Sequence, residues 1–149
     1  MGNSTLTASA IMSFAEKLED DSSAFYAKLA ERFGEGKEAF LGFAKESKKN
    51  KIHLVRTYQE TISDALEASF SFEGLELPDY DLETALAEDI SLKKALEMAL
   101  EIEEEASKVY SQIAEQAQSL LATIPRAFSR VAKKRRARKE VLRLLLDKA

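Results

Sequence analysis

The chain places a glutamate seven residues ahead of a tyrosine twice, in Glu19-Asp-Asp-Ser-Ser-Ala-Phe-Tyr26 and in Glu103-Glu-Glu-Ala-Ser-Lys-Val-Tyr110. An offset of 84 residues relates the two segments, and a further match follows each of them. Phe40-Leu-Gly-Phe-Ala-Lys45 corresponds to Phe128-Ser-Arg-Val-Ala-Lys133 at an offset of 88. Self-similarity at a fixed offset is the signature of a repeated structural unit. The sequence therefore reads as two copies of one helical hairpin, and the four-residue difference in offset falls in the turn of the second copy.

Four amphipathic segments are predicted as the helices of these hairpins, because apolar side chains recur in them every three or four residues. They cover residues 7–32, 37–68, 92–121 and the segment from Pro125 onward. Residues 69–91 contain Gly74 and Pro78, which break the periodicity and indicate a long connection. Short links make antiparallel neighbours, whereas a long central link allows a crossover. We therefore predict one all-α domain over residues 1–149, a four-helix bundle of two hairpins joined by a crossover connection.

Composition removes several classes of site. The 149 residues include no Cys, which excludes disulfides, thiolate metal sites and a Cys nucleophile. His53 is the sole histidine, so one chain cannot supply two imidazoles to a site. No apolar run approaches the ~20 residues of a membrane span, and the first ten residues carry no targeting signature. We expect a cytoplasmic protein without membrane association.

Six polar residues fall at inward positions of the predicted helices, with apolar neighbours a turn or two away. The two repeats place them at equivalent levels, so we expect them to meet near the middle of the bundle. They are Glu19 in the first helix, Ser47 and Asn50 in the second, Glu103 in the third, and Arg135 and Arg138 in the fourth.

With these residues in register, the chain resembles the rubrerythrin-like branch of the ferritin-like di-iron proteins. That family carries the Glu-then-Tyr pair on one helix and Phe-x-x-Leu-Ala-x-Glu-Glu-x-x-His on the next, and it repeats the unit. Phe40-x-x-Phe43-Ala44-x-Glu46 and Phe128-x-x-Val131-Ala132 follow the second motif. The resemblance implies a ferritin-like bundle whose glutamates and Glu-x-x-His pairs hold two irons, with peroxidase, oxidase or iron-storage activity.

The chain departs from the family at four of the six ligand positions. Ser47 and Asn50 replace the ligand Glu and His of the second helix, and Arg135 and Arg138 replace those of the fourth. Arginine stays protonated and offers no lone pair to a metal. Buried carboxylates are costly unless they are paired. We therefore expect the two arginines to neutralise the two buried glutamates.

These substitutions predict a salt-bridge cluster in place of the di-iron centre, completed by hydrogen bonds from Ser47, Asn50, Tyr26 and Tyr110. The competing interpretation takes both arginine side chains to the surface from a tilted helix. The expected function is that of a rubrerythrin-like protein without a di-iron centre or other cofactor, which acts as a non-redox binding, interaction or structural protein. The alternative is an iron-dependent oxidoreductase or iron-handling protein of the same family.

A second metal hypothesis uses Glu19, Glu46, His53 and Glu103 as a displaced metal site. Its competitor places His53 at the edge of the helix face, bonded to water or to a neighbour. The competitor is favoured, because there is no second histidine and the nearby arginines would repel a metal ion.

The net charge of −4 conceals two opposed regions. Residues 126–149 hold ten Lys and Arg against two acidic residues, whereas Glu97–Glu105 holds five Glu and no Lys or Arg. We expect the basic run Lys133–Lys139 to pair with this acidic stretch inside the fold. Nucleic-acid binding is less favoured, because the run has no interleaved aromatic residues for base stacking, and an unknown protein partner is a third possibility. The leucines near residue 144 suit packing or a homodimer contact.

Overall fold

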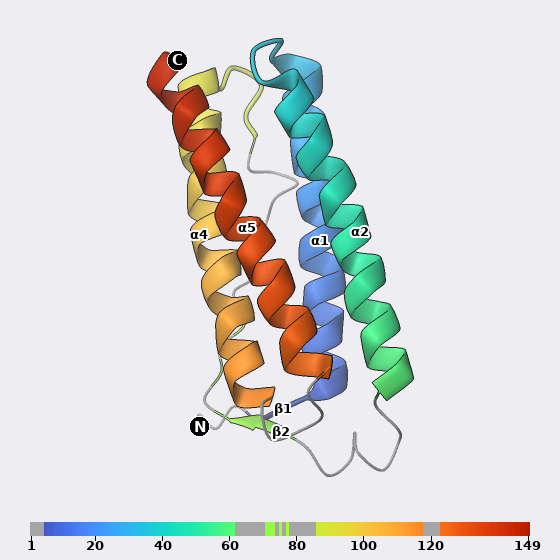
Figure 1. Ribbon diagram of the computed structural model, residues 1–149. Coiled ribbons are helices and arrows are strands. Elements are labelled where there is room, and N and C mark those ends of the chain that lie inside the picture. Colours follow the sequence, from blue (N-terminus) through green and yellow to red (C-terminus); the bar gives the residue numbers. More distant parts are fainter. Residues whose placement is uncertain (1–4, 62–70, 74, 76, 78–85, 118–122) are drawn as a thin grey trace.

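The computed structural model describes residues 5–61, 71–73, 75, 77, 86–117 and 123–149 (Figure 1). Within these residues the chain forms four helices, α1 (Ala8–Arg32), α2 (Lys37–Thr61), α4 (Leu92–Gln116) and α5 (Thr123–Lys148). They lie side by side, with α1 packed on α2, α4 packed on α5, and further contacts between α2 and α5. The predicted all-α four-helix bundle is confirmed.

Side-chain caps explain where two of the helices begin. The hydroxyl of Thr7 accepts a hydrogen bond from the backbone N–H of Ala10 at 3.1 Å, and that of Ser91 accepts one from Lys94 at 3.1 Å. Each cap satisfies a backbone donor that the first helical turn leaves unpaired. Pro125 lies in the first turn of α5, where its missing N–H costs nothing. Residues 62–68 and 118–121, predicted as helical, lie outside the described residues.

Two three-residue strands were not predicted. β1 (Thr5–Thr7) and β2 (Ser71–Glu73) pair antiparallel at the N-terminal end of α1. Three residues are too few for alternation to show in a sequence. At the other end of α1, the Arg32 guanidinium donates a hydrogen bond to the carbonyl of Ala87 at 2.6 Å. Glu73 and Ala87 therefore lie at opposite ends of α1, and α4 begins at the end of the bundle where α1 finishes (Figure 1).

The apolar core is divided into two clusters along the bundle. Ile11 and Leu54 belong to the cluster at the β1 end, whereas Leu29 and Leu142 belong to the cluster at the opposite end. On every helix, buried polar residues fall between the residues of the two clusters. They include Glu19 and Ser22 on α1, Ser47 and Asn50 on α2, Glu103 on α4, and Arg135 and Arg138 on α5.

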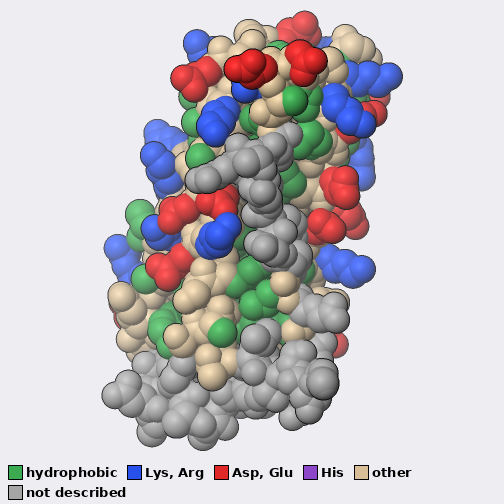
Figure 2. Space-filling model, turned by 180° about the vertical axis from the view of Figure 1, so that it is seen from behind, with side chains coloured by type: hydrophobic (Ala, Val, Ile, Leu, Met, Phe, Trp, Pro, Cys, Tyr) green, Lys and Arg blue, Asp and Glu red, His purple; other side chains and the backbone are tan. Residues whose placement is uncertain are grey.

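The surface carries both signs of charge. On the face seen in Figure 2, Lys and Arg side chains are interspersed with Asp and Glu side chains. None of the described helices combines the length and the apolar character that a membrane span requires.

Candidate functional site

The six inward polar residues lie together in one layer of the bundle. None of the six is more than 2% exposed, and hydrogen bonds or ion pairs join every member to another. Neither arginine reaches the surface, since Arg135 is 0% and Arg138 is 1% exposed. We call this layer, together with Ser22, the Glu–Arg cluster: Glu19, Ser22, Ser47, Asn50, Glu103, Arg135 and Arg138.

Arg135 bridges the two buried glutamates. Its Nη1 donates to both carboxylate oxygens of Glu103, at 3.0 and 3.1 Å. Its Nε and Nη2 lie 3.2 and 2.9 Å from Oε2 of Glu19, and Nη2 also donates to Oγ of Ser22 at 2.8 Å. One guanidinium from α5 therefore connects a carboxylate of α1 to a carboxylate of α4.

Arg138 extends the cluster toward α2. Its Nη1 donates to Glu103 Oε2 at 3.1 Å, its Nη2 to Ser47 Oγ at 3.0 Å, and its Nε to Glu46 Oε1 at 2.7 Å. The guanidinium carbon also lies 5.6 Å from the centre of the Tyr26 ring and 5.4 Å from that of Phe43. Both distances fall within the range of cation–π attraction. Through its three hydrogen bonds and these two ring contacts, the Arg138 guanidinium has a partner at every nitrogen and at its carbon.

Each of the two tyrosines donates a hydrogen bond to a glutamate of the other helical hairpin. Tyr26 on α1 donates to Oε2 of Glu103 on α4 at 2.5 Å, and Tyr110 on α4 donates to Oε2 of Glu19 on α1 at 2.6 Å. Burial, and then the neighbouring glutamate, raises the pKa of each tyrosine well above its ordinary value. Both hydroxyls therefore stay protonated and act as hydrogen-bond donors. Asn50 Nδ2 supplies a weaker contact to Glu19 Oε1, at 3.3 Å.

The Glu103 carboxyl and the Arg135 guanidinium each favour the ionised form. Burial would raise the pKa of the Glu103 carboxyl, but Arg135 and Arg138 outweigh burial and lower that pKa below its ordinary value. Burial would likewise lower the pKa of Arg135, yet Glu103 and Glu19 raise it well above the usual range. The two glutamates and two arginines sum to zero charge. This balance compensates the desolvation of the four groups, which costs several kcal/mol per ion when unpaired.

The residues of the Glu–Arg cluster do not fit a di-iron centre. A di-iron centre of the kind found in rubrerythrin-like proteins needs carboxylate and imidazole groups whose lone pairs are free to bind the metal. Here both oxygens of Glu103 and Oε2 of Glu19 accept hydrogen bonds from protonated side chains. Arg135 and Arg138 stay protonated and offer no lone pair to a metal. Among the residues that the structure describes, no group of three or more His, Cys, Asp or Glu side chains is arranged to hold a metal ion.

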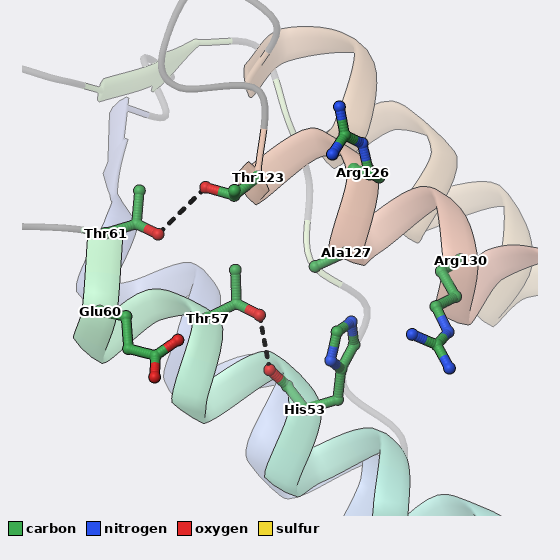
Figure 3. A pocket seen from close by; sticks show the side chains of 8 residues that line it. All are labelled: His53, Thr57, Glu60, Thr61, Thr123, Arg126, Ala127 and Arg130. Carbon is green, nitrogen blue, oxygen red and sulfur yellow. Dashed lines mark hydrogen bonds between the residues drawn. The ribbon is translucent and has the colours of Figure 1, made fainter.

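The four residues of the second metal hypothesis, Glu19, Glu46, His53 and Glu103, are not arranged as a metal site in the described part of the chain either. Glu46 is engaged by Arg138, and its side chain is 31% exposed at the rim of the cluster. His53 instead lines a cavity between α2 and α5 (Figure 3). Its Nε2 is buried and has no hydrogen-bond partner in the described part of the chain. Of the two partners expected for His53, water or a neighbouring residue, no neighbouring residue bonds Nε2 among those residues.

The basic run on α5 divides between the interior and the surface. Arg135 and Arg138 point inward to Glu103, and Lys139 forms an ion pair with Glu104. The side chain of Arg136 donates to Ser111 of α4 at 3.1 Å. The contacts of Arg135, Arg138 and Lys139 therefore join the basic run to Glu103 and Glu104 of the acidic stretch, whereas Arg136 contacts α4 beyond that stretch.

Sequence reasoning gave no part in this layer to Ser22, a member of the Glu–Arg cluster, or to Glu46, which contacts Arg138 at its rim. Ser22 follows Glu19 by three residues on the same helical face, and this spacing is a signal that it faces the same layer. Glu46 was assigned to the second family motif and to the displaced metal set. Nothing in its spacing points to the ion pair with Arg138, because it is displaced around α2 from the inward Ser47.

In comparisons with known proteins, no family model matches the chain, and neither a curated protein nor a solved structure matches it.

Proposed function

We propose that the protein is a rubrerythrin-like bundle in which the Glu–Arg cluster stands where the resembling family holds its di-iron centre. In this proposal the protein performs no redox chemistry. It works instead as a binding, interaction or structural protein that uses the bundle as a rigid scaffold.

One observation carries the proposal. The Arg135 guanidinium lies between Glu19 and Glu103, the two positions that match family ligands, and contacts both carboxylates within 3.2 Å. A metal ion bridging the same carboxylates would need the space and the lone pairs that this cation uses. Bidentate contacts between guanidinium and carboxylate are among the strongest side-chain interactions. Arg135 thus supplies the positive charge that iron would supply.

The ferritin-like connectivity is part of the same proposal. Its support is the placement of Glu73 and Ala87 at opposite ends of α1, as a lengthwise crossover requires. Residues 69, 70 and most of 74–85 of the proposed connection lie outside the described residues.

Restoration of the missing ligands tests the proposal. The variant combines Ser47→Glu, Asn50→His, Arg135→Glu and Arg138→His, which rebuilds both Glu-x-x-His pairs. The matched control carries Ser47→Gln, Asn50→Gln, Arg135→Gln and Arg138→Gln, which removes the cations without adding metal ligands. Metal analysis follows reconstitution of both folded proteins with Fe²⁺ without oxygen.

We expect about two irons per chain in the restored variant, the stoichiometry of a carboxylate-bundle site, and none in the glutamine control. Equal iron in both proteins would show that the four positions do not surround a latent di-iron site, and the proposal would fail.

A further inference from the structure

A cavity of about 200 Å³ lies between α2 and α5, at the end where α2 finishes and α5 begins (Figure 3). It shares no lining residue with the Glu–Arg cluster. Figure 3 shows His53 on α2 and Arg130 on α5 projecting into the gap from opposite helices. The cavity is therefore separate from the Glu–Arg cluster.

The lining of this cavity is rich in groups that recognise anions. Arg126 and Arg130 are one helical turn apart on α5, and neither has an ion-pair partner among the described residues. Thr61 and Thr123 share a hydrogen bond of 3.1 Å across the two helices, in which either hydroxyl can donate. Whichever hydroxyl accepts keeps its own hydrogen for a ligand. The cavity also lies beside the first turns of α5, where the helix dipole favours negative charge.

His53 supplies a second, independent indication. Its Nε2 is a buried polar atom without a partner in the described part of the chain. Buried polar atoms without a partner are rare in folded proteins, and a bound ligand, ion or water molecule is the usual explanation for them. Burial, followed by the positive charges of Arg130, Lys134 and Arg56, lowers the pKa of this imidazole. An anion placed here would offset those charges.

We propose that the cavity binds one small oxyanion of the phosphate type, with Arg126 and Arg130 supplying charge and His53 and a threonine hydroxyl supplying hydrogen bonds. Glu60, exposed at the edge, contributes one negative charge against the two arginines. Among the residues that line the cavity the excess of positive charge is modest, which suits a single phosphate group rather than a polyphosphate. The phosphate is either free or carried by a small molecule.

The lone histidine makes the test direct. The imidazole signals of these 149 residues all belong to His53, and they are followed by NMR while inorganic phosphate is added at constant ionic strength. We expect a saturable shift of these signals and a rise in the pKa of His53. Arg130→Gln should weaken phosphate binding about tenfold or more, the effect of losing a charge-assisted hydrogen bond. The same titration of Arg126→Gln should show a similar loss.

Arg136→Gln is the matched control, since Arg136 is an exposed arginine of α5 that contacts Ser111 outside the cavity. Its phosphate affinity should stay within about twofold of the parent, because Arg136 does not line the cavity and exposed charges are partly screened by salt. Circular dichroism checks that every variant folds. A shift that never saturates, or an equal loss of affinity in Arg136→Gln, would overturn the proposal.

A parallel titration with glycerol 3-phosphate separates the two sources of the ligand. Tighter binding of this monoester than of inorganic phosphate supports a phosphorylated small molecule as the ligand, and weaker binding supports the free ion. Failure of both compounds to bind would contradict the proposed oxyanion site.

Discussion

At the scale of single residues, Arg135 links the two helical hairpins. Its guanidinium contacts Glu19 on the first hairpin and Glu103 on the second, and it is fully buried. Replacement of a whole buried ion cluster by apolar residues is often neutral or stabilising, whereas removal of one partner leaves an uncompensated charge. The structural role of Arg135 is therefore to compensate two buried carboxylates.

We predict that Arg135→Met lowers the free energy of unfolding by about 3–5 kcal/mol, because both glutamates lose their shared cation. Urea denaturation measures this loss. Arg136→Met, on the exposed face of the same helix, is the control and should change stability by less than about 0.5 kcal/mol. Addition of Glu19→Gln to Arg135→Met should recover part of the loss. Equal stability of the two arginine variants would contradict the bridging role.

Acid sensitivity follows from the lowered pKa of Glu103. The unfolded carboxyl titrates near 4.5, and Arg135 and Arg138 hold the folded pKa below that value. Its contribution to stability is therefore complete above pH 4.5 and is lost as the pH falls through the lower, folded pKa. We predict that stability declines more steeply below pH 4.5 in the parent chain than in Glu103→Gln.

His53 produces a separate acid effect at higher pH. Its folded pKa is lowered from 6.5, so stability also falls on acidification below that value. Denaturation curves for the Glu103 comparison are therefore best recorded in a His53→Gln background. Parallel pH profiles with and without Glu103→Gln in that background would show that Glu103 is not the source of the loss below pH 4.5.

The first hairpin turn illustrates the element scale. Gly36 has φ of +85°, a left-handed conformation, between the end of α1 and the start of α2. A Cβ at this position would lie 3.0 Å from Leu145 Cδ1 and 3.2 Å from Phe40 Cε2. The turn thus brings α1 and α2 together while packing against the last turns of α5.

We predict that Gly36→Ala destabilises the protein by about 1–2 kcal/mol, since it combines backbone strain with crowding against two side chains. Thermal unfolding of the variant measures the cost. Gly34→Ala is the matched control, because a Cβ there meets nothing within 4 Å. Equal melting temperatures for the two alanine variants would refute the account of this turn.

Local periodicity explains how much of the elements and of the cluster could be predicted. Spacings of three and four residues determine which side chains face inward, so Glu19 and Arg135 were assigned to the core from sequence. The paired strands escaped prediction, because three residues carry no periodic signal. The ion pair between Glu46 and Arg138 also escaped, since it depends on how far a long side chain reaches across to another helix. The cavity at His53 likewise arises only when α2 and α5 are packed together.

At the scale of the whole molecule, the opposed charges of the chain meet partly inside it. Residues 126–149 carry the excess of positive charge. Three of their side chains form ion pairs with glutamates of α4: Arg135, Arg138 and Lys139. The Glu–Arg cluster then separates two apolar clusters that fill the opposite halves of the bundle. This charge-balanced layer between the two apolar clusters is the feature on which the proposed function rests.

The iron content of the parent protein tests this proposal most directly. The protein is incubated with excess Fe²⁺ without oxygen, dialysed, and analysed for metal per chain. We predict that no stoichiometric iron is retained, because Arg135 and Arg138 satisfy the carboxylates that iron would need. Retention of about two irons per chain, as in carboxylate four-helix bundles, would contradict the replacement of a di-iron centre by the Glu–Arg cluster.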